Sequence, residues 1–459
     1  MSTSASMGPV VSPSQGNNFG ILAMEIYFPS LYVSQSELGI GFCALCLECH
    51  DNVSQGKYTK GLGQTNMAVC APCEDICSIS LNAVSQLMSK YKISYQSIGR
   101  LEVGTETLID KSKSIKSVIM DLFNGNGCYD VEGVDVKNAC YGGVAAFFNT
   151  IAWMESSCWD GRLGLVVAGD IAVYERGPAR PTGGAGVVAI LVGPNAPIVC
   201  NGVRASHMKH AYDFFKPNLS TDFPIVDGPL SLKSYFEALS SCYRLFRTKR
   251  NITSKSPLDA YDFYLFHSPF GKLVQKALSK LVIEDRLNNS SIMKTLTVSM
   301  IRRMYEALNF DDKTLENEML AASQELFLQK TQPTLACSRE LGNIYCGALF
   351  SGLISLICSQ AGDSLIGKKC LLFAYGSGYC SSMFELRITS SVEYISKTIA
   401  LSERLSERTK ISPIQFSLLL DDKGHAENAK FNSLVPNRTI VLSEIDAKCR
   451  RIYQAKSEK

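Results

Sequence analysis

The sequence predicts an α/β protein built from two similar halves, packed as alternating layers of helices and sheets. Its 459 residues are 46% hydrophobic, which is enough apolar mass for a large core. A buried strand, a polar residue at the strand end and a helix rich in small residues follow one another in a repeated order. This order occurs on both sides of about residue 193, which indicates a duplicated unit.

The expected boundaries follow from this repeat and from composition. Residues 1–18 are rich in Ser, Pro, Gly and Asn and are expected to be a disordered tail. Residues 19–193 form the first predicted half and residues 194–455 the second. The first twenty residues lack both the basic start and the apolar run of a secretory signal, and they contain no Arg.

Charge and composition exclude several classes of protein. The net charge is only +3, which argues against a dedicated nucleic-acid binder. We find no run of 18 or more apolar residues, so no membrane span is predicted. The 17 cysteines in a chain without a signal peptide favour reduced thiols and a cytoplasmic location.

The first half begins with alternating buried strands and amphipathic helices. Residues 19–29 read as a buried strand that ends at a proline, and residues 75–91 show helical apolar spacing. Residues 98–107 read as a strand that runs into Glu106, followed by a helix over 112–123. Ligands gather at the carboxyl ends of strands in open sheets, so Glu106 is either a functional residue or a turn glutamate.

Cys140 is expected where a buried strand over 129–136 gives way to a helix over 138–153. Unpaired N–H groups and a partial positive charge at a helix start favour a thiolate, the form in which cysteine is a nucleophile. Gly142 and Gly143 are expected to keep space open beside the sulfur. The alternative is a buried structural cysteine.

Residues 161–193 read as two apolar strands around a loop rich in Gly, Pro and Arg, with Asp170 and Tyr174 at the end of the first strand. His207 and His210 lie in a helix or a loop.

The second half repeats the order of the first: a buried strand, a polar residue at its end and a helix. A helix is predicted over 230–247, and residues 263–278 read as a strand, then His267, then a helix. Residues 288–330 are polar and helical, and residues 341–357 form a helix rich in small residues.

Lys272 and Lys276 are four residues apart and share a helix face. Residues 368–388 read as a strand, a Gly-Ser-Gly turn containing Ser377, and a returning strand; after Thr389 the chain is polar. If the two halves pack face to face, the strand ends of both should converge between them.

Two further segments carry weaker signals. Residues 56–67, with three glycines and two lysines, read either as a loop for an anionic ligand or as a solvated turn. The cysteine-rich front suggests a zinc site or scattered core cysteines, and the loose spacing of the pairs favours core cysteines without metal. The residues concerned are Cys43, Cys46, Cys49, His50, Cys70, Cys73 and Cys77.

Nine short motifs of this sequence occur in the same order as in a known family. LEVGTETLIDKSKS, NACYGG, VVAGDIAVY, ARPTGG, HAYDF, PIVDG, FHSPFGKLVQK, GNIY and YGSG follow one another over about residues 19–390, and CRRIY continues the pattern weakly. The chain thereby resembles eukaryotic 3-hydroxy-3-methylglutaryl-CoA synthases. The resemblance implies a thiolase-like αβαβα core with added C-terminal elements, a homodimer and no cofactor. It also implies an acyltransferase that joins acetyl-CoA and acetoacetyl-CoA in the pathway to isoprenoids and sterols.

The resemblance assigns the chemistry to three residues. Cys140 would accept the acetyl group, Glu106 would act as general acid and base, and His267 would position and polarise acetoacetyl-CoA. A partly desolvated carboxyl with a raised pKa suits both proton transfers, and an imidazole can hydrogen-bond the ketone as negative charge develops there. Backbone N–H groups near Cys140 and at the turn around Ser377 would supply oxyanion contacts.

The resemblance also places contacts with the CoA thioesters. The lysines suit phosphate groups, and the other residues match positions that contact or support the acyl portion. The substrate-binding residues so implied are Ser54, Gln55, Asp170, Tyr174, Thr182, Ser231, Lys272, Lys276, Asn343 and Ser377.

Two alternative functions stay open at this stage. The first alternative is a subunit that binds acyl-CoA but no longer catalyses the reaction. It stays open because Pro178 stands where the family usually has asparagine, and because Ser54 and Gln55 stand where the family has Asp and Ala. A thiolase would carry a second catalytic cysteine near the C-terminal Gly-Ser-Gly turn, where Cys380 lies, although Ser377 occupies the turn itself.

Overall fold

The computed structural model describes residues 18–36, 46–252, 257–288, 313–360, 362–421 and 425–457. The predicted tail lies outside these residues except for its last member, Asn18. The architecture is organised around a nine-stranded sheet in the order β11-β12-β13-β8-β1-β7-β6-β4-β5. Its strands are β1 (Gly20–Tyr27), β4 (Ile98–Gly104), β5 (Asp135–Val136), β6 (Leu163–Ala172), β7 (Gly184–Gly193), β8 (Ile198–Met208), β11 (Phe263–Phe266), β12 (Lys369–Gly376) and β13 (Cys380–Ile388).

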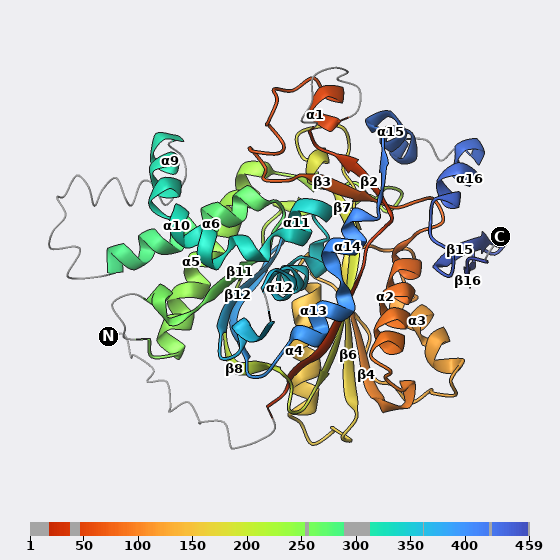
Figure 1. Ribbon diagram of the computed structural model, residues 1–459, viewed down its shortest axis with the longest axis horizontal. Coiled ribbons are helices and arrows are strands. Elements are labelled where there is room, and N and C mark those ends of the chain that lie inside the picture. Colours follow the sequence, from red (N-terminus) through yellow and green to blue (C-terminus); the bar gives the residue numbers. More distant parts are fainter. Residues whose placement is uncertain are drawn as a thin grey trace.

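Helices cover both halves of this sheet and fill the space between them (Figure 1). On one outer side, α2 (Ile76–Lys90) and α3 (Ile115–Asn124) pack on β1, β4, β6 and β7. In the centre, α4 (Gly142–Met154) meets α12 (Ala348–Ser359), where the Phe147 and Phe350 rings lie 5.7 Å apart. On the other outer side, α5 (Gly228–Lys249) and α6 (Gly271–Asn288) pack on β11, β12 and β13. The expected layering of helix, sheet, helix, sheet and helix is confirmed.

The two halves are joined through a short antiparallel contact between β1 and β8. Gly20 pairs with Val199 and Ile21 pairs with Ile198, so the two sheets form one continuous ladder. Strand β7 is buried along its whole length, as expected for a central strand covered by helices on both faces.

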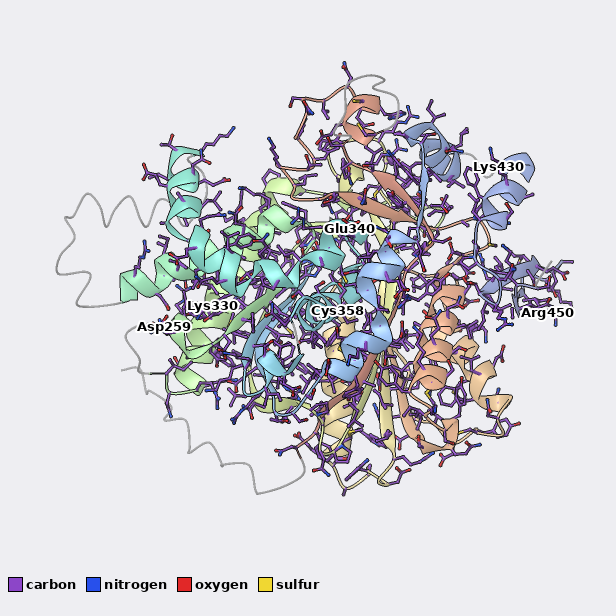
Figure 2. All side chains as sticks on the ribbon, viewed as in Figure 1. Asp259, Lys330, Glu340, Cys358, Lys430 and Arg450 are labelled. Atoms are coloured by element: carbon purple, nitrogen blue, oxygen red, sulfur yellow. The ribbon has the colours of Figure 1, made fainter. Side chains whose placement is uncertain are left out.

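The C-terminal region, which reads as polar in the sequence, contributes to a further hydrophobic core that includes Leu31, Val69 and Phe416. Strand β2 (Leu31–Ser34) lies between β3 (Asn66–Val69) and β14 (Thr409–Ile411). Arg408 ties this region to the body through a 2.7 Å ion pair with Glu340, which lies near the centre of Figure 2. The remaining elements are α1 (Leu47–His50), β9 (Phe214–Phe215), β10 (Ile225–Val226), α9 (Lys313–Ala322), α10 (Gln324–Lys330), α11 (Ala336–Leu341), α13 (Glu393–Ile399), α14 (Leu401–Ser406), α15 (Pro413–Asp421), α16 (His425–Ser433), β15 (Ile440–Ile445) and β16 (Arg451–Ala455).

Three expectations about elements are wrong. The buried strand predicted over 129–136 shrinks to the two residues of β5, and Tyr129 and Val134 are exposed. The small-residue helix begins at Ala348 rather than at residue 341, because a left-handed Tyr345 (φ 40°) and a 3₁₀ turn precede it. His207 lies in strand β8, not in a helix or loop. Part of the predicted helical region, residues 289–312, lies outside the described residues.

No described helix combines the length and the apolar character needed to cross a bilayer.

Candidate active site

Cys140 lies two residues before α4, on a backbone that bends sharply. The preceding residue, Ala139, is left-handed (φ 44°), a conformation that costs free energy for a residue with a β-carbon. Strand β4 ends at Gly104, so Glu106 emerges beside this bend. The thiol of Cys140 donates a hydrogen bond to Glu106 Oε2 at 3.6 Å. The end of β4 and the start of α4 therefore bring the predicted acid/base and the predicted nucleophile together.

The two glycines at the start of α4 have a different role from the one expected. A β-carbon at Gly142 would lie 2.6 Å from the carbonyl oxygen of Val136, and one at Gly143 would lie 2.8 Å from the β-carbon of Ala168. These neighbours are protein atoms, so the glycines allow α4 to approach the sheet closely rather than hold space open beside the sulfur.

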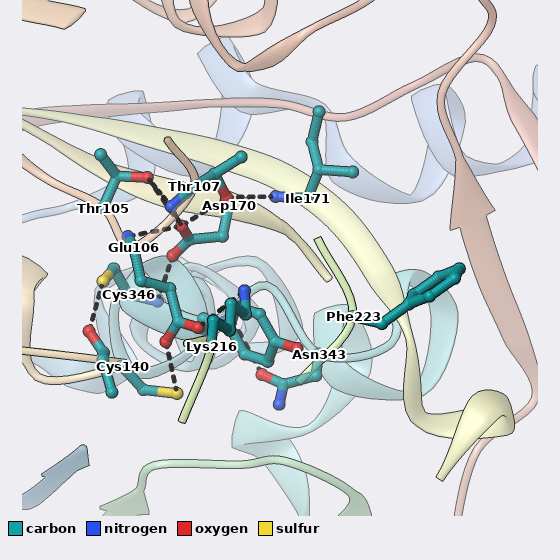
Figure 3. A network of polar contacts seen from close by, with 12 residues as sticks. Thr105, Glu106, Thr107, Cys140, Asp170, Ile171, Lys216, Phe223, Asn343 and Cys346 are labelled. Carbon is teal, nitrogen blue, oxygen red and sulfur yellow. Dashed lines mark hydrogen bonds and ion pairs between the residues drawn. The ribbon is translucent and has the colours of Figure 1, made fainter. Parts of the chain in front are cut away.

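Asp170, at the end of β6, organises the backbone around Glu106 (Figure 3). Its Oδ1 accepts hydrogen bonds from the Thr105 hydroxyl at 2.6 Å, the Glu106 N–H at 2.8 Å and the Thr107 N–H at 2.9 Å. Its Oδ2 accepts from the Cys346 N–H at 2.9 Å. One fully buried carboxyl thus joins the end of β4 in the first half to the segment before α12 in the second.

The environment of Cys140 opposes the thiolate that a helix start was expected to favour. Burial raises the pKa of the Cys140 thiol, and the negative charges of Glu106 and Asp170 raise it further. The helix-start argument fails because desolvation and two nearby carboxylates outweigh a partial charge. Burial also raises the pKa of Glu106 to about 7, although Lys216 acts to lower it.

His267 lies directly after β11, and its backbone N–H donates to Phe373 O at 2.8 Å. The hydroxyl of Tyr235 donates to the carbonyl oxygen of His267 at 2.9 Å. Burial lowers the pKa of His267 to about 3, so its imidazole is neutral at physiological pH. A neutral imidazole can donate one hydrogen bond without bringing a positive charge.

A cavity of about 1510 Å³ opens between the two halves. It brings together residues from distant parts of the chain, including one wall from α5 and one from α6. The predicted site residues that line it are Cys140, Tyr174, Thr182, Ser231, His267, Lys276, Asn343 and Ser377. Asn343 Oδ1 accepts from the Tyr345 N–H at 2.9 Å, which fixes the amide beside the cavity.

Four predicted substrate contacts lie elsewhere. Ser54 and Gln55 are exposed in the loop after α1, away from the wall of this cavity. Asp170 is fully buried, its oxygens accept hydrogen bonds from the protein, and it does not line this cavity. The Lys272 ammonium donates to Gln275 Oε1 at 3.0 Å, and it is Lys276 that lines the cavity.

The oxyanion contacts expected from the Gly-Ser-Gly turn are reduced by one. The Gly378 N–H donates to Asp213 Oδ1 at 2.8 Å, so it is already satisfied. Asp213 also accepts from the Tyr375 hydroxyl at 2.8 Å. This buried aspartate, which sequence reasoning did not assign, anchors the turn that carries Ser377.

Sequence reasoning also missed Lys216, which follows β9. Its ammonium lies 3.0 Å from Glu106 Oε1. The signal was present in HAYDFFKPN, where an acid and a lysine stand three residues apart, but nothing in the local sequence shows which side chain the lysine meets.

The described cysteines of the cysteine-rich front have different environments. Cys46, Cys73 and Cys77 are buried. Cys49 is disulfide-bonded, against the expectation of reduced thiols throughout. Cys43 lies outside the described residues. Across the described ranges, we find no group of three or more His, Cys, Asp or Glu side chains arranged to hold a metal ion.

Comparison with known proteins places these features in one family. Two family models match the chain: "Hydroxymethylglutaryl-coenzyme A synthase N terminal" over residues 15–197 and the corresponding C-terminal model over residues 198–456. Hydroxymethylglutaryl-CoA synthase A of Dictyostelium discoideum is 46% identical over 416 residues, 90% of this chain and 84% of that protein. The cytoplasmic hydroxymethylglutaryl-CoA synthase of Mus musculus is 43% identical over 459 residues, 95% of this chain and 86% of that protein.

A solved structure agrees with the sequence comparisons. MvaS in complex with 3-hydroxy-3-methylglutaryl coenzyme A superposes with a TM-score of 0.81 at 27% identity, over 96% of this chain and 100% of that one. The likeness therefore extends through both halves of the fold.

Proposed function

The chain belongs to the hydroxymethylglutaryl-CoA synthase family, and we propose that it converts acetyl-CoA, acetoacetyl-CoA and water to 3-hydroxy-3-methylglutaryl-CoA and CoA. The observation that carries this proposal is the contact of the Cys140 thiol with the Glu106 carboxyl, 3.6 Å apart, beside a cavity that His267 also lines. A nucleophile, an acid/base and a neutral hydrogen-bond donor are the groups that a carbon–carbon condensation of thioesters requires.

The first step loads the acetyl group. The Cys140 sulfur attacks the carbonyl carbon of acetyl-CoA, the carbon–sulfur bond to CoA breaks, and the proton lost by Cys140 leaves with the CoA sulfur. Loading thus ends with no net change in the protonation of Glu106. The product is a thioester on Cys140, which keeps the methyl hydrogens of the acetyl group acidic enough to remove.

The second step forms the carbon–carbon bond. Glu106 takes a proton from the acetyl methyl group, and the resulting carbon attacks the ketone carbon of acetoacetyl-CoA. His267 donates a hydrogen bond to the ketone oxygen as it becomes an alkoxide, and Glu106 then returns to this alkoxide the proton that it took from the methyl group. A pKa of Glu106 near 7 suits a group that both takes and returns protons at neutral pH. Water then cleaves the Cys140 thioester and releases the product.

The cavity supports binding of both CoA thioesters. Lys276 lines it and forms a 2.9 Å ion pair with Glu316, which holds the ammonium in place at the cavity wall. Pro178 lines the same cavity in place of the asparagine usual in the family, and its side chain offers no hydrogen bond to the acyl portion. The reaction as written needs no cofactor.

The test is incubation of the protein with radiolabelled acetyl-CoA, followed by tryptic mapping of the label. We expect label on the peptide with Cys140, and its transfer to 3-hydroxy-3-methylglutaryl-CoA when acetoacetyl-CoA is added. Cys140→Ser should carry no label, because a hydroxyl is far less ionised than a thiol. A protein that binds acyl-CoA but never loads acetyl would instead be a binding subunit.

We also propose that two chains associate along the edge strand β5, where the exposed Tyr129 and Val134 lie close by in sequence. Sedimentation should then give a mass near twice that of one chain.

A cytoplasmic location is proposed from the name of the Mus musculus relative. A division of the chain into two halves near residue 193 is proposed from the repeated order of helices and strands.

A further inference from the structure

The two carboxyl oxygens of Glu106 have different partners. Oε2 accepts from the Cys140 thiol at 3.6 Å, whereas Oε1 lies 3.0 Å from the ammonium of Lys216 (Figure 3). The side chain of Glu106 is 5% exposed and that of Lys216 is 20% exposed, so water screens this ion pair only weakly. One oxygen is therefore held by a cation while the other faces the nucleophile.

Lys216 is itself held in place. Its ammonium lies 5.0 Å from the centroid of the Tyr345 ring and 5.8 Å from that of Phe214. These distances suit cation–π attraction, which adds to the ion pair. The segment is anchored three residues earlier, where Asp213 accepts from Tyr375 and Gly378. The ammonium thus reaches Glu106 from a fixed position rather than from a mobile surface chain.

The charges around Glu106 differ in sign. Asp170 on β6 is a second buried carboxyl, and its charge acts with burial to disfavour ionisation of Glu106. Lys216 acts in the opposite direction, and the charges of Glu106 and Asp170 outweigh burial to keep the pKa of Lys216 raised. The other titratable neighbours of Glu106 are uncharged at neutral pH because burial raises the pKa of each. They are Cys140, Tyr174, Tyr345 and Cys346.

We propose that Lys216 is a positioning residue for the condensation, which holds Glu106 as a carboxylate with Oε2 turned toward the group carried by Cys140. This inference rests on the proposed role of Glu106 as acid and base. Lys216 contacts Glu106 through Oε1 and acts on the reacting atoms through that carboxyl. Without the ammonium, burial and Asp170 would leave Glu106 protonated at neutral pH, unable to take the methyl proton.

The experiment measures the pH dependence of condensation alone. Enzyme is loaded with labelled acetyl at high pH, moved to the test pH, and mixed with acetoacetyl-CoA in a single-turnover assay. Lys216→Met removes the charge and Lys216→Arg keeps it, while Lys216→Gln is a second charge-free variant in case Met disturbs folding. Lys397→Met is the matched control, because it removes an ion-paired lysine that is 73% exposed on α13.

We expect the rising limb of the wild-type profile to move up by about 1–3 pH units in both charge-free variants, the range for losing a close opposite charge. At pH 6.5 their condensation rate should fall at least about eightfold, and the difference should close at high pH. Lys216→Arg and Lys397→Met should keep the wild-type midpoint. A folded charge-free variant with the wild-type midpoint, or one slowed equally at every pH, would overturn the inference.

A substrate-free measurement separates this inference from the proposed function. The rate at which iodoacetamide alkylates the Cys140 peptide is followed against pH by mass spectrometry. The midpoint should move to higher pH in Lys216→Met, because the cluster loses a positive charge that favours its ionised forms. If wild-type protein failed to load acetyl, the proposed function would fall, yet this shift would still report the coupling of Lys216 to Glu106 and Cys140. An unchanged midpoint would count against Lys216 alone.

Discussion

Replacing Glu106 by glutamine should separate the two chemical steps. Glutamine keeps the volume of the buried side chain but cannot take or return a proton at neutral pH. Its amide oxygen can still accept the hydrogen bond that the Cys140 thiol donates at 3.6 Å. The charge of Glu106 is one of the causes that raise the pKa of Cys140, so removing it makes the thiolate more accessible. Loading of acetyl should therefore be retained or become faster.

Condensation should respond in the opposite way. Acid–base groups contribute on the order of 10²–10⁴-fold, which corresponds to about 3–5 kcal/mol in the barrier. The pKa of Glu106 near 7 adds a second signature. About half of the wild-type molecules hold the carboxylate at pH 7 and about one in a hundred at pH 5, so wild-type condensation should fall steeply over this range. The residual rate of the variant should stay flat.

The assay is a single turnover that reports acetyl-enzyme and product separately across this pH range. Circular dichroism and thermal unfolding serve as controls, since Glu106→Gln leaves Lys216 without its carboxylate partner. A folded variant that lost loading and condensation by the same factor would refute the assignment of Glu106 to the second step. So would a residual rate that kept the wild-type pH dependence.

Three further outcomes are expected. Because burial lowers the pKa of His267 to about 3 from 6.5, the unfolded chain binds more protons than the native protein between these values. The free energy of unfolding should therefore decrease as the pH is lowered, and it should decrease more steeply in wild type than in His267→Gln, by up to about 1.4 kcal/mol per pH unit. Urea denaturation at several pH values measures both slopes. Equal slopes in the two proteins would contradict a neutral His267. Gly143→Ala should lower the free energy of unfolding by about 1–3 kcal/mol and slow acetyl loading, because the added β-carbon would lie 2.8 Å from that of Ala168. Chemical denaturation measures the stability, and labelling with acetyl-CoA measures the loading. Unchanged loading would show that α4 can move without displacing Cys140. Elemental analysis should find no stoichiometric zinc in the cysteine-rich front, and one zinc per chain would overturn that prediction.

The sequence predicts the elements whose pattern is local and strong. Strand β7 contains only glycine and apolar residues, and it is buried at every position. The helix after Cys140 carries its apolar residues at helical spacing, and it forms as expected. The segment before it does not, because Tyr129 and Val134 are apolar in sequence yet exposed. Local hydrophobicity cannot tell a buried strand from an apolar edge, since burial depends on what packs against it.

The sequence by itself also determines which chemical groups this protein has: one thiol at the start of a helix, one carboxyl and one imidazole at strand ends. The tertiary structure alone decides how those groups ionise. Cys140 meets Glu106 across 34 residues, and Glu106 meets Lys216 across a further 110. A helix start favours a thiolate, but two carboxylates and burial reverse that preference here. Ionisation depends on charges and desolvation within a few ångströms, and the fold, not the order of residues, sets those neighbours.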